Sequence, residues 1–129
     1  MAREKKDDDS LFYERRRYPR VPVMIMFDNL FDTEKLMYIG RGFLRDISAG
    51  GVCFEVRDNI RLGARLALSL ELPSGSTLKH IRAEVVRSKK ESSIYAIGCI
   101  FNKLGFFNGM KLRMFLRKDL KIQLDSVKK

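Results

Sequence analysis

The sequence contains no tryptophan, a single histidine, two cysteines and three prolines. His80, Cys53 and Cys99 are far apart in the chain and match neither a metal-binding spacing nor a disulfide framework. No apolar run approaches the roughly 20 residues of a membrane-spanning helix. The charged N-terminus does not resemble a signal peptide. We therefore expect a cytoplasmic protein that holds no metal or cofactor and has no membrane span.

The charge balance is strongly positive, with 26 lysines and arginines against 16 aspartates and glutamates, a formal net charge of +10. Such a surplus favours an anionic partner but does not identify it. No paired acid and base, glycine-rich phosphate loop or nucleophile beside a base can be recognised. The sequence therefore predicts a binding protein rather than an enzyme.

Hydrophobic patterning predicts one mainly β domain. About six short segments alternate apolar with polar residues between positions 21 and 101, and turn-forming residues separate them. We expect an antiparallel barrel or sandwich, with residues 28–37 as a loop after the first strand. An amphipathic helix is predicted over about residues 105–120. Its apolar residues form two groups at helical spacing: Phe107, Met110 and Met114, and Leu112, Leu116 and Leu120.

Arginines cluster directly before the first predicted strand, in the segment Arg15-Arg16-Arg17-Tyr18-Pro19-Arg20. A guanidinium group is planar, always charged and well shaped to bind phosphate. Pro19 and Pro22 favour an extended backbone around Arg20. By itself the segment is equally typical of a solvated basic surface or of a nucleic-acid contact.

A second polar segment, Asp46-Ile47-Ser48-Ala49-Gly50-Gly51, lies between two predicted strands. Its composition predicts a tight turn, which the side chains of Asp46 and Ser48 could cap. Without a second motif in the chain, a purely structural turn would be the preferred interpretation.

In this order, the two segments resemble the paired motifs of the PilZ domain, the bacterial receptor module for cyclic di-GMP. Arg16 to Arg20 matches its R-x-x-x-R motif, and Asp46 to Gly51 matches its D/N-x-S-x-x-G motif. The resemblance covers roughly residues 12–120. It implies a six-stranded antiparallel β-barrel with a C-terminal α-helix. The expected parts are a tail (1–11), an arm (12–20), the barrel (21–101), the helix (about 105–120) and a second tail (121–129).

The resemblance also implies a cyclic di-GMP site, to which the arm contributes three arginines. Arg16 and Arg20 would bind the phosphates and the acceptor edge of a guanine, since a guanidinium meets O6 and N7 bidentately. Arg15 would stack on a guanine face, an arrangement that goes with an intercalated pair of ligands in this family.

The turn would contribute the other three residues of that site. Asp46 and Ser48 would hold another part of a guanine, where Asp46 can accept the N1–H and N2–H donors. Gly51 would form the turn, at a position where a Cβ could block the ligand or the backbone angle.

A member of this family would bind the nucleotide, change conformation and pass the signal to a protein effector, in control of motility, exopolysaccharide or biofilm. Two alternatives stay open. One is a nucleic-acid-binding basic β-barrel, against which the clustering of arginines in an arm and the scarcity of exposed aromatic residues argue. The other is a PilZ-like interaction module that does not bind the nucleotide. The sequence leaves a homodimer possible and the effector unidentified.

Overall fold

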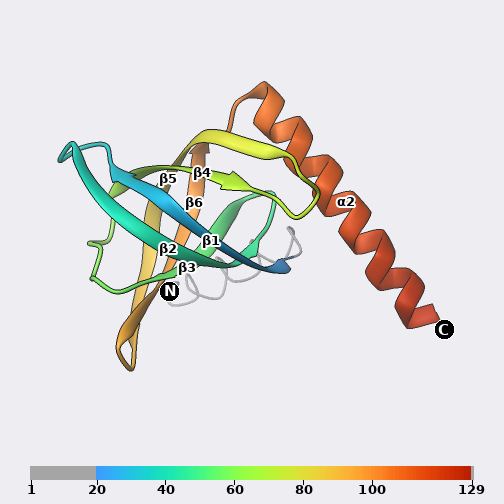
Figure 1. Ribbon diagram of the computed structural model, residues 1–129, viewed down its shortest axis with the longest axis horizontal. Coiled ribbons are helices and arrows are strands. Elements are labelled where there is room, and N and C mark those ends of the chain that lie inside the picture. The colour runs from blue at the N-terminus through green and yellow to red at the C-terminus, as the bar shows by residue number, and fades with distance from the viewer. Residues whose placement is uncertain (1–19, 129) are drawn as a thin grey trace, which may run out of the picture.

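The computed structural model describes residues 20–128, apart from the side chains of Lys103 and of residues 119–128. The predicted tail (1–11) and the arm up to residue 19 lie outside the described residues. Six strands form one closed antiparallel barrel in the order β1-β2-β3-β6-β5-β4 (Figure 1). The strands are β1 (Val21–Asp32), β2 (Met37–Ile47), β3 (Gly51–Val56), β4 (Arg65–Glu71), β5 (Thr77–Glu91) and β6 (Ile94–Lys103). The predicted six-stranded barrel is confirmed.

Alternation along the strands fills the barrel interior. In β4, Leu66, Leu68 and Leu70 are buried, while Ala67 and Ser69 between them are more exposed. Each buried leucine contributes roughly 2 kcal/mol from removal of apolar surface from water. The barrel closes through a short pairing of β1 with β4, at Phe31 with Ala67 and at Asp32 with Leu66.

One helix, α2 (Phe106–Lys128), follows the barrel. Its buried residues Gly109, Leu112 and Leu116 lie at helical spacing on one side. The predicted helix start is close to the observed one, but the predicted end near residue 120 and the separate tail over 121–129 are wrong. The helix continues to Lys128 because residues 119–128 contain no glycine or proline that would end it.

The predicted loop over residues 28–37 is also wrong, because most of it is strand. Strand β1 continues to Asp32, with irregular pairing between Phe27 and Phe31, and Leu30 is fully buried. Asn29 bridges to β4 with its side chain: Nδ2 donates to the Ser69 carbonyl oxygen at 3.1 Å, and Oδ1 accepts from the Ser69 N–H at 2.7 Å. The amide that suggested a turn therefore closes the barrel seam between β1 and β4.

The actual turn between β1 and β2 is built around Asp32, which is only 3% exposed. Its Oδ1 accepts hydrogen bonds from the backbone N–H groups of Glu34 (3.0 Å) and Lys35 (2.9 Å). Its Oδ2 pairs with Arg61 Nη1 at 2.9 Å. Burial opposes the charged form, but these hydrogen bonds and the Arg61 charge outweigh it, so the pKa of Asp32 lies below its usual value.

Candidate functional site

The motif turn, residues 48–51, joins β2 to β3 and is held by its own hydrogen bonds. The Ser48 N–H donates to the Gly51 carbonyl oxygen at 2.9 Å, and the Gly50 N–H donates to Ser48 Oγ at 3.2 Å. The Phe101 N–H donates to the Gly50 carbonyl oxygen at 2.9 Å, which fastens the turn to β6. The Ser48 hydroxyl thus caps the turn in this structure, as the structural interpretation of the motif expects.

Gly51 is required by the neighbouring strand rather than by its backbone angle. It is not among the glycines with positive φ. A Cβ at Gly51 would lie 2.0 Å from the carbonyl oxygen of Cys99 on β6, far inside van der Waals contact. The close approach of the two strands therefore excludes a side chain here, and the expectation of a special turn angle at Gly51 is wrong.

A β-bulge turns Asp46 outward. The pairing of β2 with β3 shifts between Leu44 and Asp46, which leaves Arg45 as an extra residue. Leu44 and Ile47 are both fully buried, so Arg45 and Asp46 lie between two inward-facing positions. In a regular strand Asp46 would share the inward face of Leu44. The bulge instead places its carboxylate, half-buried, on the outer wall of the barrel.

Strand pairing brings Arg87 to the same part of the wall. Asp46 pairs with Cys53, Cys53 with Gly98, and Gly98 with Arg87, so one row crosses β2, β3, β6 and β5. A Cβ built on Gly98 would lie 3.1 Å from Arg87 Nη2 and 3.3 Å from Arg87 Nε. The missing side chain of Gly98 thus leaves the space in which the Arg87 guanidinium lies across β6.

Asp46 has cations around it, and no described residue donates a hydrogen bond to it. Burial raises the pKa of the Asp46 carboxyl, while the charges of Arg20, Arg45 and Arg87 act in the opposite direction. Among residues 20–118, none donates a hydrogen bond to this carboxylate within the usual distance. Arg45 is already paired with Glu55 Oε2 at 3.1 Å and with Glu91 Oε1 at 3.4 Å. The group can therefore accept hydrogen bonds from outside the fold.

The structure describes four of the six predicted site residues, and these four lie near one another. Arg20 directly precedes β1, where Pro22 pairs with Asp46, and its charge acts on the Asp46 carboxyl. Ser48 and Gly51 follow in the adjoining turn. Arg15 and Arg16 lie outside the described residues, so their predicted roles stay predictions.

Sequence reasoning did not assign Arg45 to the site, and it missed Arg87 as a neighbour of Asp46. Arg87 lies 41 positions further along the chain, and only strand pairing brings it near. The one signal in the sequence was Arg87 followed, after a turn, by a strand that contains Gly98. A glycine opposite a long basic side chain leaves space for it.

The two cysteines belong to the structure rather than to a reactive site. Cys53 is half-buried beside Asp46, and Cys99 is buried. Burial raises the pKa of both thiols, that of Cys99 to about 12. Since the thiolate is the reactive form, both groups are poor nucleophiles at neutral pH. Within the described residues, no cluster of three or more His, Cys, Asp or Glu could hold a metal ion.

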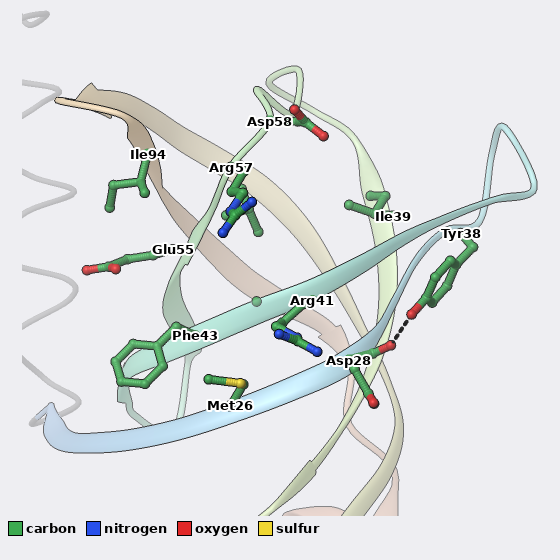
Figure 2. Close-up of a pocket in the computed structure, with 12 residues that line it drawn as sticks. Met26, Asp28, Tyr38, Ile39, Arg41, Phe43, Glu55, Arg57, Asp58 and Ile94 are labelled. Atoms are coloured by element: carbon green, nitrogen blue, oxygen red, sulfur yellow. Dashed lines mark hydrogen bonds between the residues drawn. The ribbon is translucent and has the colours of Figure 1, made fainter.

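A separate open cavity of about 540 Å³ lies further along the outer face of β1, β2 and β3 (Figure 2). It contains acidic and basic side chains together, and neither Asp46 nor the motif turn lines it. Among the side chains around it are Met26, Asp28, Tyr38, Arg41, Phe43 and Arg57. Its mixed charge does not select one class of ligand.

Comparisons with solved structures find the same fold. The chain is 21% identical to MotI, the inhibitor of motility of Bacillus subtilis, with 86% of this chain and 52% of that chain covered and a TM-score of 0.68. It is 17% identical to YcgR of Escherichia coli, solved in complex with c-di-GMP, with 88% and 50% covered and a TM-score of 0.66. It is 19% identical to MrkH of K. pneumonia, also a c-di-GMP complex, with 88% and 55% covered and a TM-score of 0.66.

The chain spans about half the length of these three proteins. It covers 98% of the isolated PilZ domain of Escherichia coli YcgR, with 89% of this chain covered, 15% identity and a TM-score of 0.62. No curated protein matches the sequence. The family model of the PilZ domain matches residues 14–118, which is most of the chain. Together with the closed six-stranded barrel, this match shows that the chain belongs to the PilZ domain family.

Proposed function

We propose that this PilZ domain is a receptor for cyclic di-GMP and passes the signal to a protein effector. The observation that carries the proposal is the environment of Asp46: a half-buried carboxylate to which no residue of the described part of the chain donates a hydrogen bond, with Arg20 and Arg87 near it. A guanine offers such a carboxylate its N1–H and N2–H donors. Its O6 and N7 atoms, and the two phosphates, are acceptors for guanidinium groups.

The division of roles follows from these positions. Asp46 accepts from one guanine, and Arg16 and Arg20 bind the phosphates and the acceptor edge of a guanine. Arg15 stacks on a guanine face. Arg87 is a further cation on the barrel side of the same site. Ser48 contributes mainly by holding the turn, and Gly51 by allowing β3 and β6 to approach.

Ligand binding would tie two parts of the chain together. Arg20 precedes β1, and Asp46 ends the strand beside it, so a ligand held by both bridges the arm to the barrel wall. The surface next to the motif turn then differs between the empty and bound states, which is what an effector can recognise. We infer a binding role, without catalysis, in the bacterial cytoplasm. The similar structures include an inhibitor of motility and two complexes with c-di-GMP, which supports this role.

Calorimetric titration of the full chain with cyclic di-GMP tests the proposal, with GTP and a short single-stranded DNA as competing classes of ligand. Arg20→Ala and Asp46→Ala should each cost on the order of 2–5 kcal/mol of binding free energy, because each removes a charged contact to a desolvated ligand. Arg65→Ala and Asp58→Ala are matched controls, since both side chains are exposed and lie away from the motif turn. They should bind as the wild type does.

A folded wild-type protein that gives no heat with cyclic di-GMP would sink the receptor proposal. Binding of DNA instead, with a steep loss of affinity in salt, would favour the nucleic-acid alternative. If the protein binds neither cyclic di-GMP nor DNA, the remaining alternative is a protein-interaction module. The molar ratio at saturation distinguishes one ligand from an intercalated pair, and sedimentation at saturation shows whether the chain dimerises.

A further inference from the structure

Helix α2 has two unlike faces, and the barrel uses only one of them. Leu112 is 1% exposed and Leu116 is 8% exposed. Polar contacts fix the start of the helix to β5: Asn108 Oδ1 accepts from the Lys79 N–H at 3.1 Å, and Asn108 Nδ2 donates to the Lys79 carbonyl oxygen at 2.7 Å. Lys111 Nζ donates to the Thr77 carbonyl oxygen at 3.1 Å. The orientation of α2 about its own axis is therefore fixed.

The opposite face is apolar and exposed. At 3.6 residues per turn, four large side chains fall on the side away from Leu112. Their exposed fractions are 73% for Phe106, 68% for Phe107, 37% for Met110 and 64% for Met114. Adjacent exposed side chains of this size are uncommon on a soluble surface and mark a contact site. We call this group, with the basic residues described next, the outer face of α2.

The outer face also carries only positive charge. Arg113, Arg117 and Lys118 are exposed, and the helical period places them beside and between the apolar side chains. Residues 106–118 contain no aspartate or glutamate; the first acidic residue of the helix is Asp119. An apolar stripe with basic residues along it is typical of helices that lie in the interface of an anionic membrane.

We propose that the outer face of α2 docks on the surface of an anionic lipid bilayer, with Phe106, Phe107, Met110 and Met114 in the acyl boundary. Arg113, Arg117 and Lys118 would pair with the headgroups. A symmetric second copy fits poorly, because over residues 106–118 both copies would bring cations and no carboxylate to pair with them. No described helix is long and apolar enough to cross a membrane, so the contact is peripheral.

The position of the helix suits a flat partner. In Figure 1, α2 lies along one side of the barrel, and its C-terminal half extends beyond it. The motif turn is made by β2 and β3, whereas α2 contacts β5 and β1. The proposed contact is independent of cyclic di-GMP and can be tested without it.

Co-sedimentation of the full chain with vesicles tests the proposal. One set contains equal parts of phosphatidylglycerol and phosphatidylcholine, and the other contains phosphatidylcholine alone. The wild type should partition into the anionic vesicles at least about tenfold more strongly. Met114→Asp and Phe107→Asp should each lower that partition about tenfold, since a charge would enter the acyl boundary. The double change Arg113→Gln with Arg117→Gln should lower it by about tenfold or more.

Matched controls separate this face from general surface properties. Leu62, at 65% exposed, lies in the β3–β4 connection and matches Met114 in exposure. Leu62→Asp should leave partition unchanged, and so should the double change Arg57→Gln with Arg65→Gln. Circular dichroism and thermal unfolding of every variant should match the wild type, because all substituted side chains are exposed.

Three outcomes would overturn the proposal. One is a wild-type protein that binds neither kind of vesicle. Another is binding that the α2 variants retain in full, which would assign it to the basic arm. The third is a wild-type dimer that Met114→Asp dissociates without any vesicle binding, which would show that a second copy covers the face.

Discussion

The two turns that flank β2 each have an aspartate beside them, but the two carboxylates differ in every respect. Asp32 is buried, receives two backbone hydrogen bonds and pairs with Arg61, and its pKa is lowered. Asp46 is half-buried, the described charges near it are those of Arg20, Arg45 and Arg87, and burial raises its pKa. The fold satisfies the first carboxylate, whereas no hydrogen bond to the second comes from residues 20–118. An unsatisfied, perturbed group on the surface is a candidate for ligand binding, whereas a satisfied one is structural.

The largest effect is expected at the turn that follows Asp46. Gly51→Ala would place a Cβ 2.0 Å from the Cys99 carbonyl oxygen, so β3 and β6 would have to separate. We expect a loss of about 3 kcal/mol in the free energy of unfolding, measured by urea denaturation. Gly109→Ala in α2 is the control, since its Cβ meets nothing closer than 3.5 Å. It should raise stability by about 0.5–1 kcal/mol. Equal stabilities for the two variants would contradict the close approach.

Removing each carboxylate in turn tests whether Asp32 is structural and Asp46 binds ligand. Asp32→Ala should lower the free energy of unfolding by about 2 kcal/mol, because the backbone N–H groups of Glu34 and Lys35 lose a charged acceptor. Asp46→Ala should leave stability unchanged or raise it, yet abolish cyclic di-GMP binding. Urea denaturation and calorimetry on the same two proteins measure both effects. If Asp46→Ala were as destabilising as Asp32→Ala, the interpretation of Asp46 as a ligand group would lose its basis.

A smaller effect separates the two arginines next to Asp46, its chain neighbour Arg45 and Arg87 of β5. Arg87→Gln should weaken cyclic di-GMP binding about tenfold, or about 1.4 kcal/mol, because no described acidic side chain pairs with it. Arg45→Gln should weaken binding less, since Arg45 is held by Glu55 and Glu91. Titration calorimetry at constant salt measures both. A larger loss of affinity in Arg45→Gln than in Arg87→Gln would show that Arg45 of β2, and not Arg87 of β5, contacts the ligand.

The smallest effect is in the pH dependence, and its sign differs between the two aspartates. The lowered pKa of Asp32 gives stability that is complete above the ordinary aspartate pKa and is lost as pH falls through the folded value. The raised pKa of Asp46 gives stability that is present below the ordinary value and is lost as pH rises through the folded value. Urea denaturation of Asp32→Asn and Asp46→Asn between acid and neutral pH measures these terms. Relative to the wild type, Asp32→Asn should be less stable and Asp46→Asn more stable at neutral pH.

Both differences should shrink on acidification, approaching zero from opposite sides. Cyclic di-GMP affinity should fall over the range in which Asp46 becomes protonated, because a neutral carboxyl loses acceptor strength for the guanine donors. That loss should begin at a higher pH than an ordinary aspartate would give. Stability differences that change in the same direction for both variants would contradict the assignment.

Local patterns were enough to predict much of this protein. The alternation in Leu66 to Leu72 indicates a strand whatever it pairs with, and the spacing of the apolar residues after Gly105 indicates a helix. The two motifs indicated the family and placed Arg20, Asp46, Ser48 and Gly51 in one candidate site. Such signals are local because side-chain direction repeats every 2 residues in a strand and every 3.6 in a helix.

Other features depended on partners distant in sequence. Asn29 looked like a turn residue until Ser69, 40 positions away, supplied its hydrogen bonds. The bulge at Arg45 decided that Asp46 faces outward, and the pairing of β5 with β6 brought Arg87 to it. The helical spacing in the sequence predicted two apolar groups on α2, one with Leu112 and one with Met114. Only packing against the barrel decided that Leu112 is buried and Met114 exposed.

By itself, then, the sequence determined the period of each element and the chemistry of its motifs, because both depend on residues a few positions apart. The tertiary structure decided register, bulges and which face of each element is buried. Those choices are set by packing and hydrogen bonds between strands tens of residues apart, whose free energy appears only when the barrel closes.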